Sequence, residues 1–174
     1  MIALYIIGGL FALILIVAAA VGTGWSYERS IIIQSPPDKV WNNFNTLAAI
    51  NRWNPWVARD PQILLKYSGV DGTPGASFSW DSELKSVGAG SQTIINAVPQ
   101  NLLASRLTFF RPFQGVGDAY IKIKEEGSST TVTWGIVSST PYPFNIIKIF
   151  GIIEKNMNKD FEEGLNRLKE LCEN

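Results

Sequence analysis

Few polar side chains in this sequence are placed where they could do chemistry. Asp81 and Glu83 are two residues apart, so a β-strand would place both carboxyl groups on one face. Acid–base catalysis by this pair would require one carboxyl group to be buried with a raised pKa. If Arg106 points inward, its guanidinium could hold the carboxylate or phosphate of an amphipathic ligand. Tyr120 is a further polar candidate. The alternative is that these groups are ordinary charges in solvent, which Lys85 near the two carboxylates favours.

Composition excludes several other kinds of site. The sequence has no histidine, the commonest general base and metal ligand, and Cys172 is its only cysteine. The glycine-rich stretch 69–75 does not lie between a strand and a helix, as a phosphate-binding loop would. Basic and acidic residues balance at fifteen each, with no basic block to hold nucleic acid. We therefore expect no cofactor, no metal and no nucleic-acid partner.

Large apolar side chains are the more informative candidates. Ligand pockets are lined mainly by apolar and aromatic groups, and rigid aromatics give contact area at little cost in conformational entropy. The residues that could line such a pocket are Trp53, Trp56, Phe78, Trp80, Arg106, Phe109, Trp134, Met157 and Phe161. The alternative for each apolar member of this set is that it fills an ordinary core.

Hydrophobic periodicity predicts the elements that would position these residues. A strand is expected over 26–34, followed by a helix whose capping box is Ser35 to Asp38 and by a short helix over 49–53. Asn54-Pro55-Trp56 is predicted to break the helical pattern. Further strands are expected over 62–67, 76–81, 87–98, 102–110, 118–125 and 130–138. A long amphipathic helix over 144–171 closes the chain, with an apolar stripe formed by Ile153, Met157, Phe161, Leu165 and Leu168.

This order of elements predicts an α+β fold. A helix as long as the last one must bury its apolar stripe, and the sheet is the only surface available. We therefore expect a curved antiparallel sheet of about seven strands that wraps around the C-terminal helix. A curved sheet against one helix leaves a space between them, which would be the origin of any binding function.

The start of the chain is an uncharged apolar run that begins at Ile2 and ends at Val21. Roughly twenty helical residues, at about 1.5 Å each, span the ~30 Å hydrocarbon core of a bilayer. Trp25 and Tyr27 follow the run where interfacial aromatics are common. The prediction is a single-pass membrane protein with an anchor and linker at 1–24 and one ligand-binding domain at 25–174.

Two features of this anchor leave alternatives open. Ala18, Ala19 and Ala20 could provide a signal-cleavage site, although no Lys or Arg precedes the run and the run exceeds the usual apolar region of a signal. Arg29 and Lys39, close to the second end of the span, favour a cytoplasmic domain. The oligomeric state is not predicted.

An ordered set of short motifs over 26–171 resembles the SRPBCC superfamily, also called START-like, Bet v 1-like or helix-grip. Within it the chain is most similar to the bacterial polyketide cyclase/dehydrase and lipid transport group. The motifs are Ile33-Gln34-Ser35-Pro36-Pro37 with Val40-Trp41, Trp53-Asn54-Pro55-Trp56, Asp60-Pro61, Tyr67-Ser68-Gly69, Gly75 with Trp80, Gly88-Ala89-Gly90, Leu107-Thr108-Phe109 with Pro112-Phe113, Thr131-Val132-Thr133-Trp134, and Lys159-Asp160-Phe161-Glu162-Glu163-Gly164-Leu165. The resemblance implies a hydrophobic cavity between the sheet and the last helix, and it transfers no catalytic constellation.

The sequence thus leads to a membrane-anchored domain that binds a small hydrophobic or amphipathic, lipid-like ligand. Two alternatives remain. One is a polyketide cyclase or dehydratase, which would need Asp81, Glu83, Arg106 or Tyr120 inside the cavity. The other is an interaction module similar to the Hsp90 activators of the same superfamily, with a filled core and an external docking surface.

Overall fold

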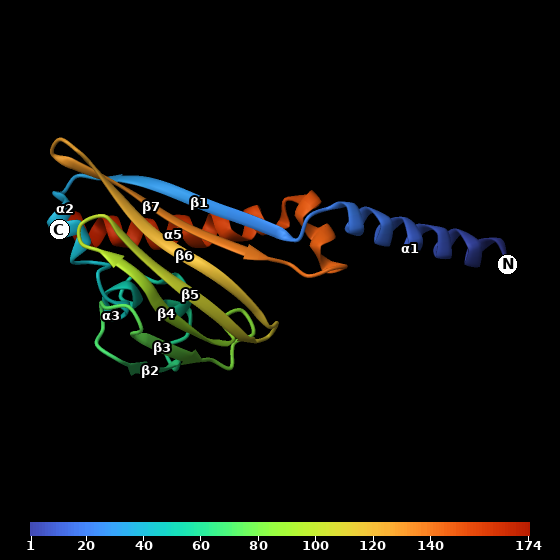
Figure 1. Ribbon diagram of the computed structural model, residues 1–174, viewed down its shortest axis with the longest axis horizontal. Helices are drawn as coiled ribbons and strands as arrows, with labels where there is room; N and C mark the ends of the chain where they lie inside the picture. Colours follow the sequence, from blue (N-terminus) through green and yellow to red (C-terminus); the bar gives the residue numbers. More distant parts are fainter.

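The computed structural model describes residues 1–174 and contains one antiparallel sheet wrapped around a long helix (Figure 1). The strands are β1 (Gly24–Ile33), β2 (Leu64–Ser68), β3 (Ser77–Asp81), β4 (Ala89–Val98), β5 (Leu102–Arg111), β6 (Gly115–Glu126) and β7 (Ser129–Ser139). The helices are α1 (Ile2–Ala20), α2 (Pro37–Trp41), α3 (Leu47–Asn51), α4 (Pro55–Arg59), the 3-10 helix η1 (Phe144–Phe150) and α5 (Ile152–Glu173). The predicted α+β helix-grip architecture is therefore confirmed.

The sheet has the order β1-β7-β6-β5-β4-β3-β2, with antiparallel pairing throughout. Strict alternation on the central strands separates a buried face from an exposed one. On β6, for example, Ala119, Ile121 and Ile123 are buried, whereas Lys122 and Lys124 are exposed. One-sided burial of this kind suits an antiparallel sheet with a single covered face.

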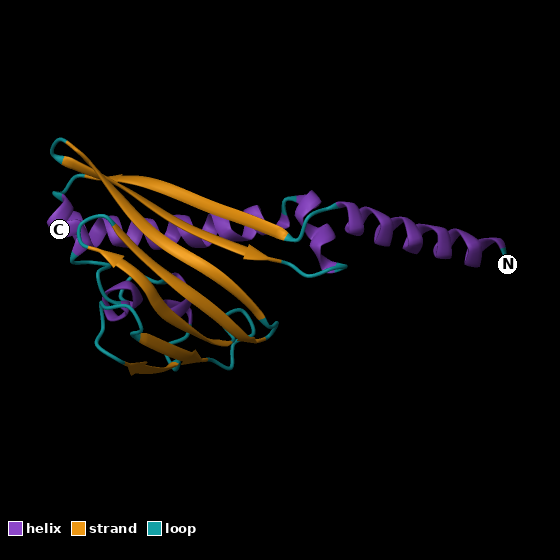
Figure 2. Ribbon diagram, in the orientation of Figure 1, coloured by secondary structure: helices purple, strands orange, loops and turns teal.

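Helix α5 lies along the inner face of the sheet and packs beside β1 (Figure 2). Phe161 stacks on Trp134 of β7, with ring centroids 4.2 Å apart and an interplanar angle of 20°. Gly164 lets the helix approach this closely, because a Cβ at this position would lie 2.7 Å from Cζ3 of Trp134. The helix therefore grips the β1–β7 side of the sheet.

Three local predictions were wrong. The C-terminal helix over 144–171 is not continuous, because Gly151 adopts a left-handed φ of 63° between η1 and α5. The breaker at Asn54 starts a helix: its side chain accepts a hydrogen bond from Trp56 N, and Pro55 suits the first position of α4. The capping box at Ser35 does not form, since Pro36 is the N-cap of α2 and no side chain caps it.

Helix α1 projects from the end of the sheet at which β1 begins (Figure 1). This helix is long enough and apolar enough to cross a membrane, and only Ala18 along it is buried. Trp25 and Tyr27, which are predicted to lie at the membrane boundary, follow this helix and are not part of it. They belong to β1 and pack against the core, and the Tyr27 hydroxyl donates to Asn158 Oδ1 at 2.9 Å.

The close approach at Gly164 yields a stability prediction. Gly164→Ala should lower the free energy of unfolding by about 1–3 kcal/mol, because the added methyl group meets Trp134 and Pro55 in a packed core. Asn166→Ala, on the exposed side of the same helix, is the matched control and should change stability by only a few tenths of a kcal/mol. Urea unfolding followed by circular dichroism measures both. A Gly164→Ala protein as stable as the parent would contradict the packing described.

Candidate functional site: an apolar cavity between the sheet and the last helix

A cavity of about 550 Å³ lies between the inner face of the sheet, α5 and the short helices α3 and α4. It exists because α5 packs along β1 and leaves the inner faces of β3–β6 partly uncovered. Most of the residues that line it are hydrophobic. The volume falls within the usual range for small-molecule sites.

Aromatic side chains form much of the wall. Phe78, Trp80 and Phe109 come from β3 and β5, with ring centroids of neighbours 5.7 and 5.9 Å apart. Trp134 and Phe161 form the opposite side, and the ring centroid of Trp56 lies 5.8 Å from that of Trp134. Trp56, Phe78, Trp80, Phe109, Trp134, Met157 and Phe161, all candidates from the sequence, line this one cavity.

The other two candidates do not line the cavity. Trp53 is fully buried behind Trp134 and donates from its indole Nε1 to Asn43 O at 2.9 Å, so it belongs to the core. Arg106 lies on the outer face and binds Asp118 in a bidentate pair, with N–O distances of 2.9 and 3.2 Å. This hydrogen bonding lowers the pKa of the Asp118 carboxyl group. Arg106 is therefore not placed to hold a ligand head group in the cavity.

The carboxylates considered for acid–base chemistry also lie outside. Asp81 is exposed and forms an ion pair with Arg111, and Glu83 is exposed in the β3–β4 connection. The Tyr120 hydroxyl donates to Glu28 Oε2 at 2.5 Å on the outer face, where the ring covers Gly135. Partial burial and this hydrogen bond raise the pKa of Tyr120 to about 12, and the same bond lowers the pKa of Glu28.

One polar pair sits on the inner wall. Gln92 on β4 donates from Nε2 to Ser105 Oγ on β5 at 2.7 Å, and both side chains are buried. Both residues line the cavity beside Phe78 and Leu107, the cross-strand neighbours of Gln92. The pair is uncharged and can offer an amide oxygen and a hydroxyl group to a bound molecule.

The exposed lining residues mark the mouth. They are Lys85 and Ser86 in the β3–β4 connection, Arg111, Pro112 and Phe113 at the β5–β6 turn, and Asn156 at the start of α5. These segments lie at the end of the sheet from which α1 projects (Figure 1). The charged residues near the cavity are therefore at its mouth, while its interior wall is neutral.

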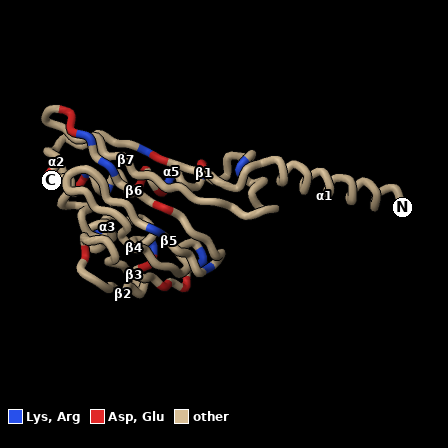
Figure 3. Tube along the Cα trace, viewed as in Figure 1, with Lys and Arg blue, Asp and Glu red and all other residues tan.

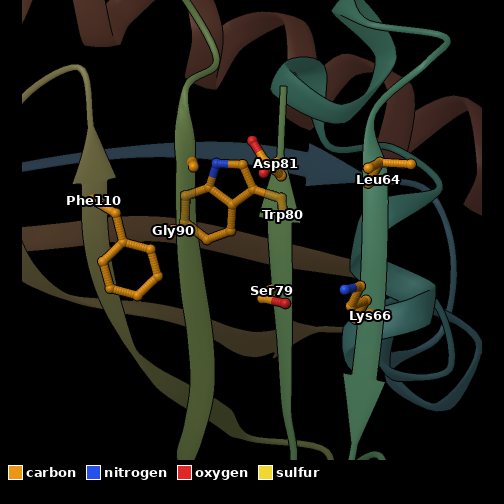
Figure 4. Close-up of a pocket in the computed structure, with 8 residues that line it drawn as sticks. Leu64, Lys66, Ser79, Trp80, Asp81, Gly90 and Phe110 are labelled. Atoms are coloured by element: carbon orange, nitrogen blue, oxygen red, sulfur yellow. The ribbon is translucent and has the colours of Figure 1, made fainter. Parts of the chain in front are cut away.

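A second depression lies on the opposite side of the sheet, over β2–β5 (Figure 4). Its volume is about 230 Å³, and its lining includes Leu64, Lys66 and Phe110. The Trp80 ring extends toward Gly90, where a Cβ would lie 2.5 Å from the indole. Gly90 thus leaves room for the Trp80 indole, and Trp80 is among the lining residues of both this depression and the large cavity.

Sequence reasoning missed Gln92, Ser105 and the mouth residues. Gln92 stands between Ser91 and Thr93 in a polar stretch, so alternation alone does not show that it faces inward. The strand register supplies that information, because it places Gln92 opposite Phe78 and Leu107. No group of three or more His, Cys, Asp or Glu side chains is placed to hold a metal ion.

Solved structures of several proteins share this fold. A protein from Chromobacterium violaceum has a TM-score of 0.61 at 15% identity, covering 86% of this chain and 97% of its own. Ara h 8.0201 has a TM-score of 0.56 at 12% identity, with 83% and 97% covered. The Aha1 dimer from Colwellia psychrerythraea has a TM-score of 0.59 at 13% identity, with 86% and 96% covered. At these identities the likeness shows the fold alone.

Sequence comparison is more specific. No curated protein matches the chain. Residues 24–173 match the family model described as polyketide cyclase / dehydrase and lipid transport. This match covers every element from β1 to α5 and confirms the resemblance drawn from the motifs. The chain belongs to the polyketide cyclase/dehydrase and lipid transport family of the SRPBCC, or Bet v 1-like, superfamily.

Proposed function

We propose that this protein is a membrane-anchored binding protein that holds one mainly apolar, lipid-like molecule in the cavity between sheet and α5. The observation that carries the proposal is the cavity itself, about 550 Å³ in volume, with an aromatic wall. Burial of roughly 400 Å² of apolar ligand surface, at about 25 cal/mol per Å², corresponds to about 10 kcal/mol before the cost of association. Micromolar affinity requires about 8 kcal/mol, so apolar contact alone is of the right order.

The polar pair on the wall, Gln92 and Ser105, indicates which polar group a ligand could carry into the cavity. A buried carboxylate or phosphate beside Gln92 and Ser105 would find no cation there, because Lys85 and Arg111 are at the mouth. Burying an unpaired charge is far more costly than burying a hydrogen-bonded hydroxyl group. The proposed ligand therefore has an apolar body and one uncharged hydroxyl or carbonyl group that reaches the inner wall.

The anchor fits this role. In the proposed division, residues 1–24 are the anchor and linker, and residues 25–174 are the ligand-binding domain. The anchor keeps this domain close to the bilayer, where apolar molecules concentrate. The mouth lies at the α1 end of the sheet, so a ligand leaving the membrane would have a short path (Figure 1). Arg29 and Lys39 favour the cytoplasmic side for this domain.

The two alternatives from the sequence receive less support. A cyclase-type reaction would need a polar reactive group inside the cavity, and Asp81, Glu83 and Arg106 lie outside it. Tyr120 is among the residues that line the cavity, but its hydroxyl group donates to Glu28 on the outer face. An interaction module with a filled core does not require the open volume that is present. The binding proposal accounts for both the volume of the cavity and the placement of the polar groups around it.

Lipid capture tests the proposal directly. Residues 24–174, purified without detergent, should retain a lipid-like molecule visible by native mass spectrometry. Ala119→Phe places a ring in the cavity and should reduce the bound fraction about tenfold or more, because each displaced methylene of ligand costs about 0.8 kcal/mol. Val137→Phe adds the same ring on the exposed outer face and should leave capture unchanged. Equal capture by all three proteins would count against the cavity as the site.

The inner polar pair yields a second prediction. The double variant Gln92→Leu/Ser105→Ala removes this pair and should weaken binding of farnesol roughly 3- to 10-fold. This factor corresponds to the loss of one hydrogen bond, which contributes about 0.5–1.5 kcal/mol. Binding of farnesene, the matching hydrocarbon, should stay the same or improve. Displacement of a hydrophobic fluorophore measures both affinities. An equal loss for both ligands would show that the pair only supports the wall.

A further inference from the structure

Five large apolar side chains are exposed within residues 142–152, which lead from the end of β7 to the first residue of α5. Phe144 and Phe150 are each 68% exposed, and Tyr142, Ile149 and Ile152 are also exposed. We name these five side chains the η1 patch. Contiguous exposed apolar groups of this kind mark a surface that contacts another phase or another molecule.

The η1 patch is fixed to the end of α1 by hydrogen bonds. Asn145 Nδ2 donates to Ala18 O at 2.7 Å and to Val21 O at 2.5 Å, and Lys148 Nζ donates to Gly22 O at 2.6 Å and also to Gly24 O. Ala18 O and Val21 O belong to the last turn and C-cap of α1, where carbonyl groups lack helical partners. A cation near this end also complements the helix dipole. Asn145 and Ala18 are both 1% exposed, so the joint is packed as well as hydrogen-bonded.

This joint determines where the η1 patch lies. If α1 spans the bilayer, its last turn is at the boundary between acyl chains and head groups, and η1 lies beside that turn (Figure 1). Residues 139–153 contain no acidic residue, and Lys148 is their only charged residue. Figure 3 shows no charge on α1 and the first charges of this end at the joint. Aromatic and aliphatic side chains with a nearby lysine suit the head-group boundary.

We propose that the η1 patch inserts into the bilayer surface as a second membrane contact, which holds the cavity mouth against the membrane. The inference rests on the proposed membrane anchoring by α1 and goes beyond it, because a tether alone leaves the orientation of the domain free. The occupant of the patch is the lipid surface. Tyr142, Phe144 and Phe150 take the interfacial place that the sequence suggested for Trp25 and Tyr27.

Site-directed spin labelling of the full chain in phosphatidylcholine vesicles tests this inference. Cys172 is fully buried, so single cysteines can be labelled in its presence, with the parent chain as the background. Labels go at Phe11→Cys in α1, at Phe144→Cys and Phe150→Cys in the η1 patch, and at Val137→Cys on the outer face of the sheet. The readout is the accessibility of each nitroxide to oxygen relative to a water-soluble nickel chelate.

The labels at 144 and 150 are expected to be oxygen-accessible and shielded from nickel at head-group depth, whereas the label at 137 is expected to be fully aqueous. A label at 11 deep in the bilayer, with aqueous labels at 144 and 150, would overturn the η1 contact and leave the anchor intact. An aqueous label at 11 would overturn both.

A variant of the joint separates the contact from general hydrophobicity. Asn145→Ala/Lys148→Ala removes the hydrogen bonds to α1 and keeps all five side chains of the η1 patch. The depth of the label at 11 should not change, and the label at 150 should show a broader, shallower distribution. An unchanged depth at 150 would overturn the role assigned to the joint. Circular dichroism of each labelled protein confirms that it is folded.

Discussion

The need to bury the apolar stripe of α5 governs this structure. Phe161, Leu165 and Leu168 are almost completely buried, and the stack of Phe161 on Trp134 fixes how close the helix lies to the sheet. Gly164 makes that distance possible, and α5 packs along β1. Because a single helix cannot cover the full width of a seven-stranded curved sheet, the inner face of β3–β6 is left with open volume. The cavity is thus a consequence of the same packing that stabilises the fold.

The placement of polar groups follows from this arrangement. Ion pairs such as Arg106 with Asp118 and Asp81 with Arg111 lie on the outer face or at the rim, where water screens them. The inner wall keeps only hydrogen bonds between neutral groups, such as Gln92 with Ser105. The result is a site suited to apolar molecules with one uncharged polar group. In the proposed arrangement, helix α1 and the η1 patch hold its mouth at the membrane, where such molecules are found.

Much of the fold could be predicted from the sequence because its elements have strong periodicity. Alternation on β6 and β7 and the stripe from Met157 to Leu168 specify which faces are covered, and a covered sheet face plus an amphipathic helix leaves few architectures. The break at Gly151 was missed because apolar residues continue on both sides of it, so the hydrophobic pattern alone looks like one helix. The α4 helix was missed because Asn54-Pro55 has the sequence of a breaker and also of a helix start.

The candidate site was predictable in type more than in detail. Aromatic residues at alternating positions identified most of the wall, but Trp53 and Arg106 depend on tertiary direction that no local pattern contains. Gln92 and Ser105 depend on strand register in the same way. The link between Asn145 and the end of α1 joins residues 127 apart in the sequence and was invisible for that reason.

The indole resonances of the protein give the most direct test that the cavity accepts a ligand. Trp25, Trp56, Trp80 and Trp134 line it, whereas Trp41 and Trp53 belong to the packed region beyond it. Titration of residues 24–174 with farnesol, followed by two-dimensional NMR of the indole N–H groups, should shift the signals of the four lining tryptophans and leave those of Trp41 and Trp53 nearly in place. Shifts at Trp41 and Trp53 alone, or no shift at saturating farnesol, would contradict the account.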